Sequence, residues 1–191
     1  MAKWPDVPNV YGWLRLDRRG NWLIKGDRIA NTGVTNFIGR NYAVDERGRW
    51  FFQNGPQRVF VTLEYTPFVV NTAGDAAAAL ETHIGQPVAK ISGAWIDETG
   101  SLLLRWGAGL GVVNDRDLAR VSGLFTDLHG RPLDDALLVR AFDPESRRHA
   151  TGAYVDYAGS RVPVGRIQSG EVAQKFGFDP APRPAEGEPD C

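Results

Sequence analysis

The stretch Asp45-Glu-Arg-Gly-Arg-Trp50 decides the fold of this chain, because its pattern occurs three times. The pattern is Asp-x-x-Gly-x followed by an apolar residue, and the other copies run from Asp17 to Trp22 and from Asp97 to Leu102. In such a turn the Asp side chain can accept hydrogen bonds from backbone N–H groups, and the Gly supplies the positive φ that closes it. The pattern therefore predicts three β-hairpins. A weaker copy begins at Asp127.

Working outward from these turns, we expect an α+β protein, built mainly of antiparallel β-hairpins in two small lobes with short helices. Residues 1–72 form the predicted N-terminal β-rich lobe, with one helix at Thr32–Tyr42, where apolar residues recur at spacings of three and four. Residues 73–87, which include four consecutive alanines, form the predicted connection. Residues 88–178 form the predicted C-terminal α+β lobe, and the Pro-rich, polar residues 179–191 a disordered tail.

The chain carries no signal for export or for a membrane. Its 191 residues contain no apolar run of the roughly 18 residues that a spanning helix needs. Lys3, Asp6 and two prolines occupy the N-terminus, where a signal peptide would have an apolar core. The lone cysteine, Cys191, allows no internal disulfide. We therefore expect a cytoplasmic protein without a membrane partner, and its oligomeric state is left open.

Positive charge and aromatic residues are concentrated in the first part of the chain. Residues 1–60 hold ten of the 22 Lys and Arg residues against five acids, and ten of the 20 aromatic residues. Such mixtures bind single-stranded nucleic acid, because rings stack on bases while cations neutralise phosphates. A small β-rich lobe also needs large side chains for its core, and the overall pI of about 6.3 lacks a strong basic bias. We therefore rank nucleic acid third among the ligand classes.

The hairpin loop Gln53-Asn-Gly-Pro-Gln57-Arg58 is the predicted ligand-binding site of the first lobe. Amide groups and a guanidinium beside a glycine suit a carboxylate, a phosphate or a peptide backbone. Asn-Gly-Pro is also ordinary turn chemistry, which needs no ligand. The candidate residues are Gln53, Asn54, Gln57 and Arg58.

No catalytic or metal-binding pattern is present. The three histidines lie apart, so no zinc site is predicted, and the turn aspartates lack the dense acids of a calcium loop. The glycines of Gly107-Ala-Gly-Leu-Gly111 have the wrong spacing for a dinucleotide loop, and no Gly-x-Ser-x-Gly sequence occurs. We expect no metal and no cofactor, and we lean against an enzyme.

Five motifs occur in one unbroken order: Trp4-Pro-Asp-Val-Pro, Tyr11-Gly-Trp-Leu, Asp17-x-x-Gly-x-Trp, Phe37-Ile-x-Arg-Asn-Tyr and the run from Asp45 to Val61. Together they resemble one uncharacterised family of proteobacterial, mainly betaproteobacterial, proteins with a domain of unknown function. The resemblance is dense over residues 4–70, looser over 94–117, and returns at Val162-Pro-Val and Lys175-Phe-Gly-Phe. It implies a protein that is not exported, and it assigns no catalytic residue, ligand or partner. Residues 126–161 depart from the family pattern.

These observations favour a non-catalytic binding or interaction module for a protein or a small anionic ligand. The alternative is an enzyme with a small-molecule pocket between the two lobes, where concave sites often form. Single-stranded nucleic-acid binding is the third hypothesis.

Overall fold

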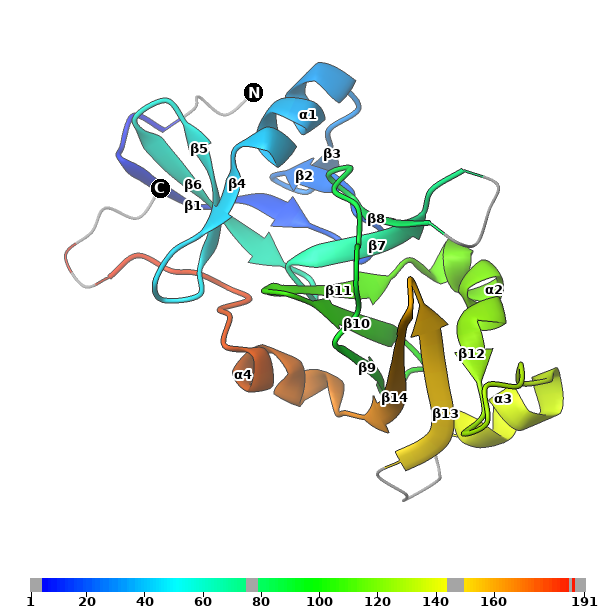
Figure 1. The fold of residues 1–191 in the computed structure, drawn as a ribbon. Coiled ribbons are helices and arrows are strands. Elements are labelled where there is room, and N and C mark those ends of the chain that lie inside the picture. Colours follow the sequence, from blue (N-terminus) through cyan, green and yellow to red (C-terminus); the bar gives the residue numbers. More distant parts are fainter. Residues whose placement is uncertain (1–4, 75–78, 144–149, 186, 188–191) are drawn as a thin grey trace. The chain divides into compact units, whose positions relative to one another are not determined.

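The computed structural model describes residues 5–74, 79–143, 150–185 and 187, which form two units, each built around one β-sheet (Figure 1). The first unit contains the residues up to Pro67 together with those from Ala173 onward. The second unit runs from Phe68 to Val172. The α+β fold class is confirmed.

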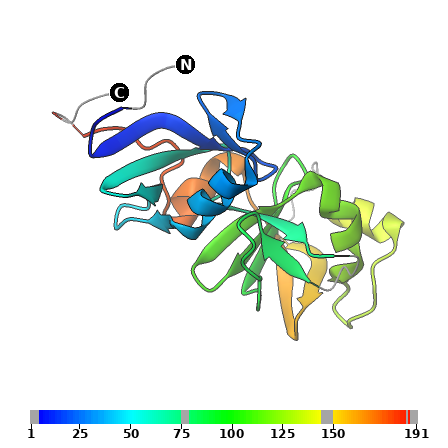
Figure 2. The same cartoon turned by 90° about the horizontal axis from the view of Figure 1, so that it is seen from above.

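The first unit has a six-stranded sheet in the order β3-β2-β1-β6-β5-β4. Neighbouring strands are antiparallel except β1 and β6, which are parallel. Helix α1 lies against one face of the sheet, with the Phe37 ring 6.1 Å from the Phe52 ring (Figure 2). The elements are β1 (Asn9–Leu16), β2 (Trp22–Ile24), β3 (Asp27–Arg28), α1 (Thr32–Arg40), β4 (Tyr42–Val44), β5 (Trp50–Asn54) and β6 (Gln57–Leu63).

The second unit has an eight-stranded sheet in the order β12-β13-β14-β9-β10-β11-β7-β8. Its apolar core includes Leu102, Leu104 and Val155, each at most 1% exposed. The strands are β7 (Phe68–Thr72), β8 (Leu80–Thr82), β9 (Gly93–Ile96), β10 (Leu102–Trp106), β11 (Gly109–Val113), β12 (Phe125–Thr126), β13 (Ala150–Tyr157) and β14 (Ser160–Arg166). The helices are η1 (Asp115–Asp117), α2 (Leu118–Val121), η2 (Ser122–Leu124), α3 (Asp135–Ala141), η3 (Ser169–Glu171) and α4 (Val172–Phe176), which ends in the first unit.

The two sheets share one topology. Read from β11 to β12, the second sheet has the order β11-β10-β9-β14-β13-β12, which matches β3-β2-β1-β6-β5-β4 strand for strand. The parallel pair β9 and β14 matches the parallel pair β1 and β6, and the remaining matched pairs are antiparallel. Strands β7 and β8 extend the second sheet beyond β11. Residues at matched positions of the two units can therefore be compared directly.

The Asp-Gly turns have the predicted geometry. Oδ1 of each turn aspartate accepts hydrogen bonds of 2.7–3.0 Å from the backbone N–H groups two and four residues later. The glycine of each turn has a φ between +74° and +83°. The weaker copy at Asp127 closes in the same way as the other three. The turn prediction is confirmed because both requirements are local to six residues.

The unit boundaries differ from the predicted lobes at both ends of the second unit. Residues 68–72 belong to the second unit because β7 pairs with β11. The predicted connection 73–87 contains β8, and residues 75–78 within it lie outside the described residues. Residues from Ala173 onward return to the first unit, where Asp179 and Pro180 of the predicted tail make backbone hydrogen bonds. Residues 186 and 188–191 of that tail lie outside the described residues.

The turn between β13 and β14 offers a stabilising substitution. Ala158 has a φ of +48° and Gly159 a φ of +72°, in a two-residue loop of a kind that prefers Asn-Gly. Ala158→Asn should raise the free energy of unfolding by about 0.5–1 kcal/mol, because Asn tolerates the left-handed conformation better than Ala. Urea denaturation would measure the change. The control, Ala30→Asn at an exposed residue without positive φ, should change little, and equal effects at both positions would contradict this explanation.

Candidate functional site

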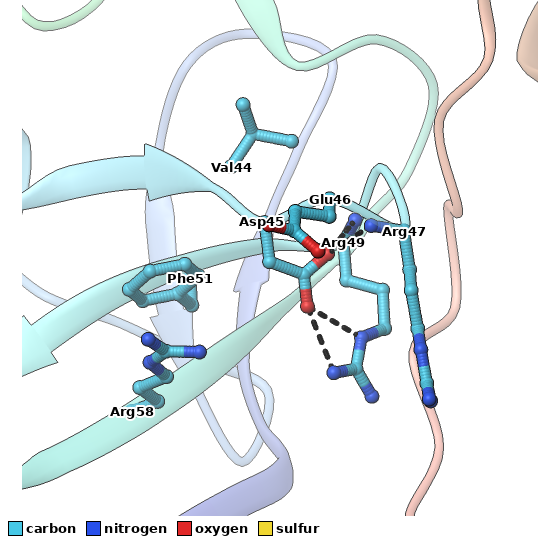
Figure 3. Close-up of a pocket in the computed structure, with 7 residues that line it drawn as sticks. All are labelled: Val44, Asp45, Glu46, Arg47, Arg49, Phe51 and Arg58. Atoms are coloured by element: carbon cyan, nitrogen blue, oxygen red, sulfur yellow. Dashed lines mark hydrogen bonds and ion pairs between the residues drawn. The ribbon is translucent and has the colours of Figure 1, made fainter.

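A pocket of about 440 Å³ opens in the first unit at the turn between β4 and β5 (Figure 3). It is lined by β4, this turn, β5 and the start of β6. Three arginines face two carboxylates in its lining, so the pocket carries a net positive charge. The lining residues are Val44, Asp45, Glu46, Arg47, Arg49, Phe51 and Arg58.

The rings of Tyr11, Phe51 and Phe60 form a buried aromatic cluster beneath two of these arginines. The register pairs Phe51 with Phe60 and Gln53 with Arg58, so strand alternation puts these four side chains on one face. The Arg49 Cζ lies 4.5 Å from the centre of the Phe60 ring, and the Arg58 Cζ lies 4.8 Å from that of Phe51. Cation–π attraction therefore helps to hold both guanidinium groups in place.

The Arg49 guanidinium is bound by the Asp45 carboxylate of the same turn and by the Tyr11 hydroxyl. Its Nε and Nη2 each lie 2.8 Å from Oδ2 of Asp45, and its Nη1 donates a 3.3 Å hydrogen bond to the Tyr11 hydroxyl. The Arg49 and Asp45 side chains are only 16% and 11% exposed. Burial raises the pKa of the Asp45 carboxyl, but hydrogen bonds from Arg49 and Arg47 outweigh burial, so its pKa is lowered overall. The ion pair therefore stays ionised at neutral pH.

Arg47 and Arg58 differ from Arg49 in their side-chain contacts. Both residues are exposed, and neither guanidinium makes an ion pair with a carboxylate in the described part of the chain. Their backbone N–H groups are used, since Arg47 donates to Asp45 Oδ1 and Arg58 to the Pro8 carbonyl. Arginine N–H groups in a fork can bind a carboxylate or a phosphate through two hydrogen bonds. The side chains of this pocket therefore have the hydrogen-bond donors and the positive charge that an oxyanion requires.

The four residues predicted as a site in the hairpin loop have different contacts in the structure. Arg58 lines the pocket. The Gln53 amide donates to the carbonyls of Gly55 and Gln57, at 2.8 and 3.1 Å. The Gln57 amide donates to two carbonyls of the N-terminal segment, at 2.8 and 3.0 Å. Asn54 is half-buried and pairs with Gln57 across the hairpin.

Sequence reasoning gave Asp45 only a turn-capping role and did not select Arg47 or Arg49. A signal was present, because the Asp45 turn has arginine two and four residues after the aspartate. The Asp97 turn has Thr99 and Ser101 at those positions. Arginines at both positions of a capped turn would have indicated a cationic site.

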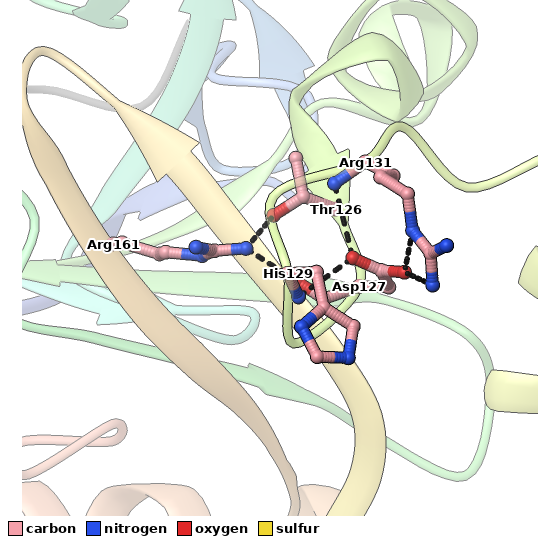
Figure 4. A network of polar contacts seen from close by, with 5 residues as sticks. All are labelled: Thr126, Asp127, His129, Arg131 and Arg161. Atoms are coloured by element: carbon pink, nitrogen blue, oxygen red, sulfur yellow. Dashed lines mark hydrogen bonds and ion pairs between the residues drawn. The ribbon is translucent and has the colours of Figure 1, made fainter.

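The second unit repeats the aspartate–arginine pair of the turn and the arginine of the last strand, but this last arginine makes different contacts (Figure 4). The Arg131 Nε and Nη2 lie 2.7 Å from Oδ2 of Asp127, as Arg49 pairs with Asp45. The hydrogen bonds, first of all that from the Arg131 backbone N–H, lower the pKa of Asp127 to about 2. Arg161 is the second residue of β14, as Arg58 is of β6, and its Cζ lies 5.3 Å from the Tyr154 ring centre.

The Arg161 guanidinium donates hydrogen bonds to the Asp127 turn, whereas the Arg58 guanidinium lines the pocket. The Arg161 Nη2 donates to the Asp127 carbonyl and, at 3.4 Å, to the Thr126 hydroxyl. In the first unit the matching residue of the strand register is Ala43, which pairs with Phe51 as Thr126 pairs with Tyr154, and its side chain has no acceptor. The hydroxyl therefore helps to explain why one arginine holds its turn and the other lies beside an open pocket.

The described residues contain no cluster of metal ligands and no helix that could span a membrane. No three His, Cys, Asp or Glu side chains among them are grouped as metal ligands. None of the helices in the described ranges has the length and the apolar character required to cross a membrane.

The comparisons with known proteins give a family and a fold. A family model described as "Protein of unknown function (DUF2946)" matches residues 1–183. No curated protein matches the chain. A DUF1285 family protein from Silicibacter pomeroyi DSS-3 is similar in structure, with a TM-score of 0.54, 17% identity, and coverage of 85% of this chain and 84% of that one. A second, from Shewanella baltica OS155, has a TM-score of 0.39 and 14% identity, with coverage of 56% and 87%.

Proposed function

This chain belongs to the family of proteins of unknown function DUF2946, as its resemblance to an uncharacterised family predicted, and we propose that it is a non-catalytic oxyanion-binding protein. The ligand is a small molecule with a carboxylate or phosphate group, and it binds in the pocket of the first unit. The observation that carries this proposal is that Arg47 and Arg58 are exposed in one pocket and that neither makes an ion pair with a described residue.

The surroundings of these two arginines support an anionic ligand. The Asp45 carboxylate is neutralised by Arg49, so Glu46 is the remaining acid of the pocket. The Phe51 ring beneath Arg58 limits the motion of that guanidinium, which lowers the entropy lost on binding. Two charge-assisted hydrogen bonds from such a group contribute about 1.5–3 kcal/mol each.

The lining chemistry favours binding over catalysis. Nucleophilic and acid–base catalysis use Ser, Cys, His, Lys or a carboxyl group with a pKa near neutrality. The pocket is lined by none of the first four, and the pKa of Asp45 is shifted downward, away from neutrality.

The burial of the aromatic residues supports keeping nucleic-acid binding as the third hypothesis. Of the ten aromatic residues in 1–60, Phe37 is 39% exposed, whereas six are at most 8% exposed and unavailable for stacking on bases. These six are Tyr11, Trp13, Trp22, Phe51, Phe52 and Phe60.

Titration of the protein with pyrophosphate, and separately with citrate, tests the proposal. We expect saturable binding of one anion per chain by calorimetry, with NMR amide shifts confined to residues 44–49, 51 and 58. Raising NaCl from about 0.01 to 0.15 M shortens the Debye length from about 30 to 8 Å, so affinity should fall. The cation spermidine serves as the control and should not bind there. Amide shifts located elsewhere, or no binding of either anion, would exclude this function.

A further inference from the structure

The two exposed arginines of the pocket lie on opposite sides of the Arg49–Asp45 ion pair. In Figure 3 the Arg49 guanidinium lies between those of Arg58 and Arg47. Arg58 belongs to β6, whereas Arg47 belongs to the turn before β5. A fork contact requires donor–acceptor distances of about 2.7–2.9 Å, so one carboxylate or phosphate group is too small to contact both guanidinium groups across the ion pair.

The aromatic rings beneath the pocket keep Arg58 beside the ion pair. The Arg58 Cζ lies over the Phe51 ring and the Arg49 Cζ over the Phe60 ring, at 4.8 and 4.5 Å from the ring centres. The centres of these two rings are 5.8 Å apart. Cation–π attraction therefore holds the two guanidinium groups over neighbouring rings.

The ion pair in the middle of the pocket has no net charge. Asp45 Oδ2 accepts hydrogen bonds from the Arg49 guanidinium, and Asp45 Oδ1 accepts from the backbone N–H groups of Arg47 and Arg49. An anionic group in the middle of a ligand would therefore meet a cation that is already neutralised. The pocket volume of about 440 Å³ is in the range of sites that hold a whole organic molecule.

We infer that the ligand of this pocket is a molecule with two anionic groups, one at each end of an uncharged middle part. This inference rests on the proposed oxyanion site. One anionic group binds Arg58 and the other binds Arg47, while the middle part lies across the Arg49–Asp45 pair. Once the first group is bound, the second is present at an effective concentration in the millimolar range, so the two contacts reinforce each other.

Straight-chain dicarboxylates from malonate to sebacate test the spacing, because all of them carry the same charge. Calorimetry should give an affinity that rises with chain length, passes through a maximum and then falls. At the maximum, the dicarboxylate should bind at least about tenfold more tightly than the monocarboxylate of the same chain length. The monocarboxylate controls for apolar contacts of the carbon chain.

Single arginine variants test whether each end of the ligand has its own partner. In Arg47→Ala and in Arg58→Ala, the dicarboxylate should exceed the monocarboxylate by only about twofold, the statistical factor for two equal ends. The control Arg28→Ala removes an exposed arginine from β3 of the same sheet and should keep the tenfold difference. All three side chains are exposed, so we expect the variants to fold.

Equal affinities for dicarboxylates of every length and for the matched monocarboxylates would overturn the recognition of two ends. The same loss in Arg28→Ala as in Arg47→Ala would also overturn it, because the effect would then come from overall charge. Saturable pyrophosphate binding in the same experiments would leave the proposed oxyanion site intact. Failure of pyrophosphate and of every carboxylate to bind would instead overturn the proposed function.

Discussion

Arg58→Ala is expected to weaken pyrophosphate binding by at least about thirtyfold, equivalent to about 2 kcal/mol, because a charge-assisted contact is lost. Its unfolding free energy should fall by no more than about 1 kcal/mol, since the exposed side chain loses mainly its cation–π contact with Phe51. Calorimetry and urea denaturation would measure the two quantities. Arg58→Lys should give an intermediate affinity, because lysine keeps the charge but not the planar fork of donors.

Arg161→Ala is the matched control, because Arg161 occupies the same topological position in the second unit. Removing this side chain breaks the hydrogen bonds to the Asp127 carbonyl and the Thr126 hydroxyl. The free energy of unfolding should therefore fall by about 1–2 kcal/mol. Pyrophosphate affinity should stay unchanged. If both alanine variants weakened binding equally, the pocket of the first unit would not be the binding site.

Gly48→Ala is expected to lower the free energy of unfolding by about 3 kcal/mol, whereas Gly100→Ala should cost about 1 kcal/mol. Both glycines occupy the same position of an Asp-Gly turn, with φ of +74° and +83°, so both substitutions strain the backbone. A Cβ at Gly48 would lie 2.3 Å from the Gly177 carbonyl oxygen and 3.0 Å from Phe178 Cα, whereas a Cβ at Gly100 meets nothing within 4 Å.

Urea denaturation followed by tryptophan fluorescence would measure this difference. NMR signals of residues 177–180 should shift in Gly48→Ala and stay in place in Gly100→Ala. Equal losses of stability would mean that the close packing of the C-terminal segment on the turn contributes nothing. The comparison therefore tests how much the packing of residues 177–178 on the Gly48 turn stabilises the first unit.

The residues of the candidate site show where local reasoning succeeds. Arg58 was selected from the sequence because a guanidinium at the end of a hairpin is visible in one short stretch. Arg47 and Arg49 were passed over, because their importance depends on Asp45 capping the turn and on the cross-strand neighbours of β5 and β6. Gln53 and Gln57 have the same side-chain chemistry in the sequence, but their partners are backbone carbonyls of the hairpin and the N-terminal segment.

The sequence by itself determined the α+β class, the hairpins at the Asp-Gly turns and the family, because turn chemistry and motifs are local. Only the tertiary structure decided the parallel pairing of β1 with β6, the addition of β7 and β8 to the second sheet, and the return of residues 173–185 to the first unit. Each of these depends on backbone hydrogen bonds between residues far apart in the chain. The contrast between Arg58 and Arg161 has the same origin, since Thr126 offers an acceptor and the matching Ala43 does not, and only folding brings each arginine to its turn.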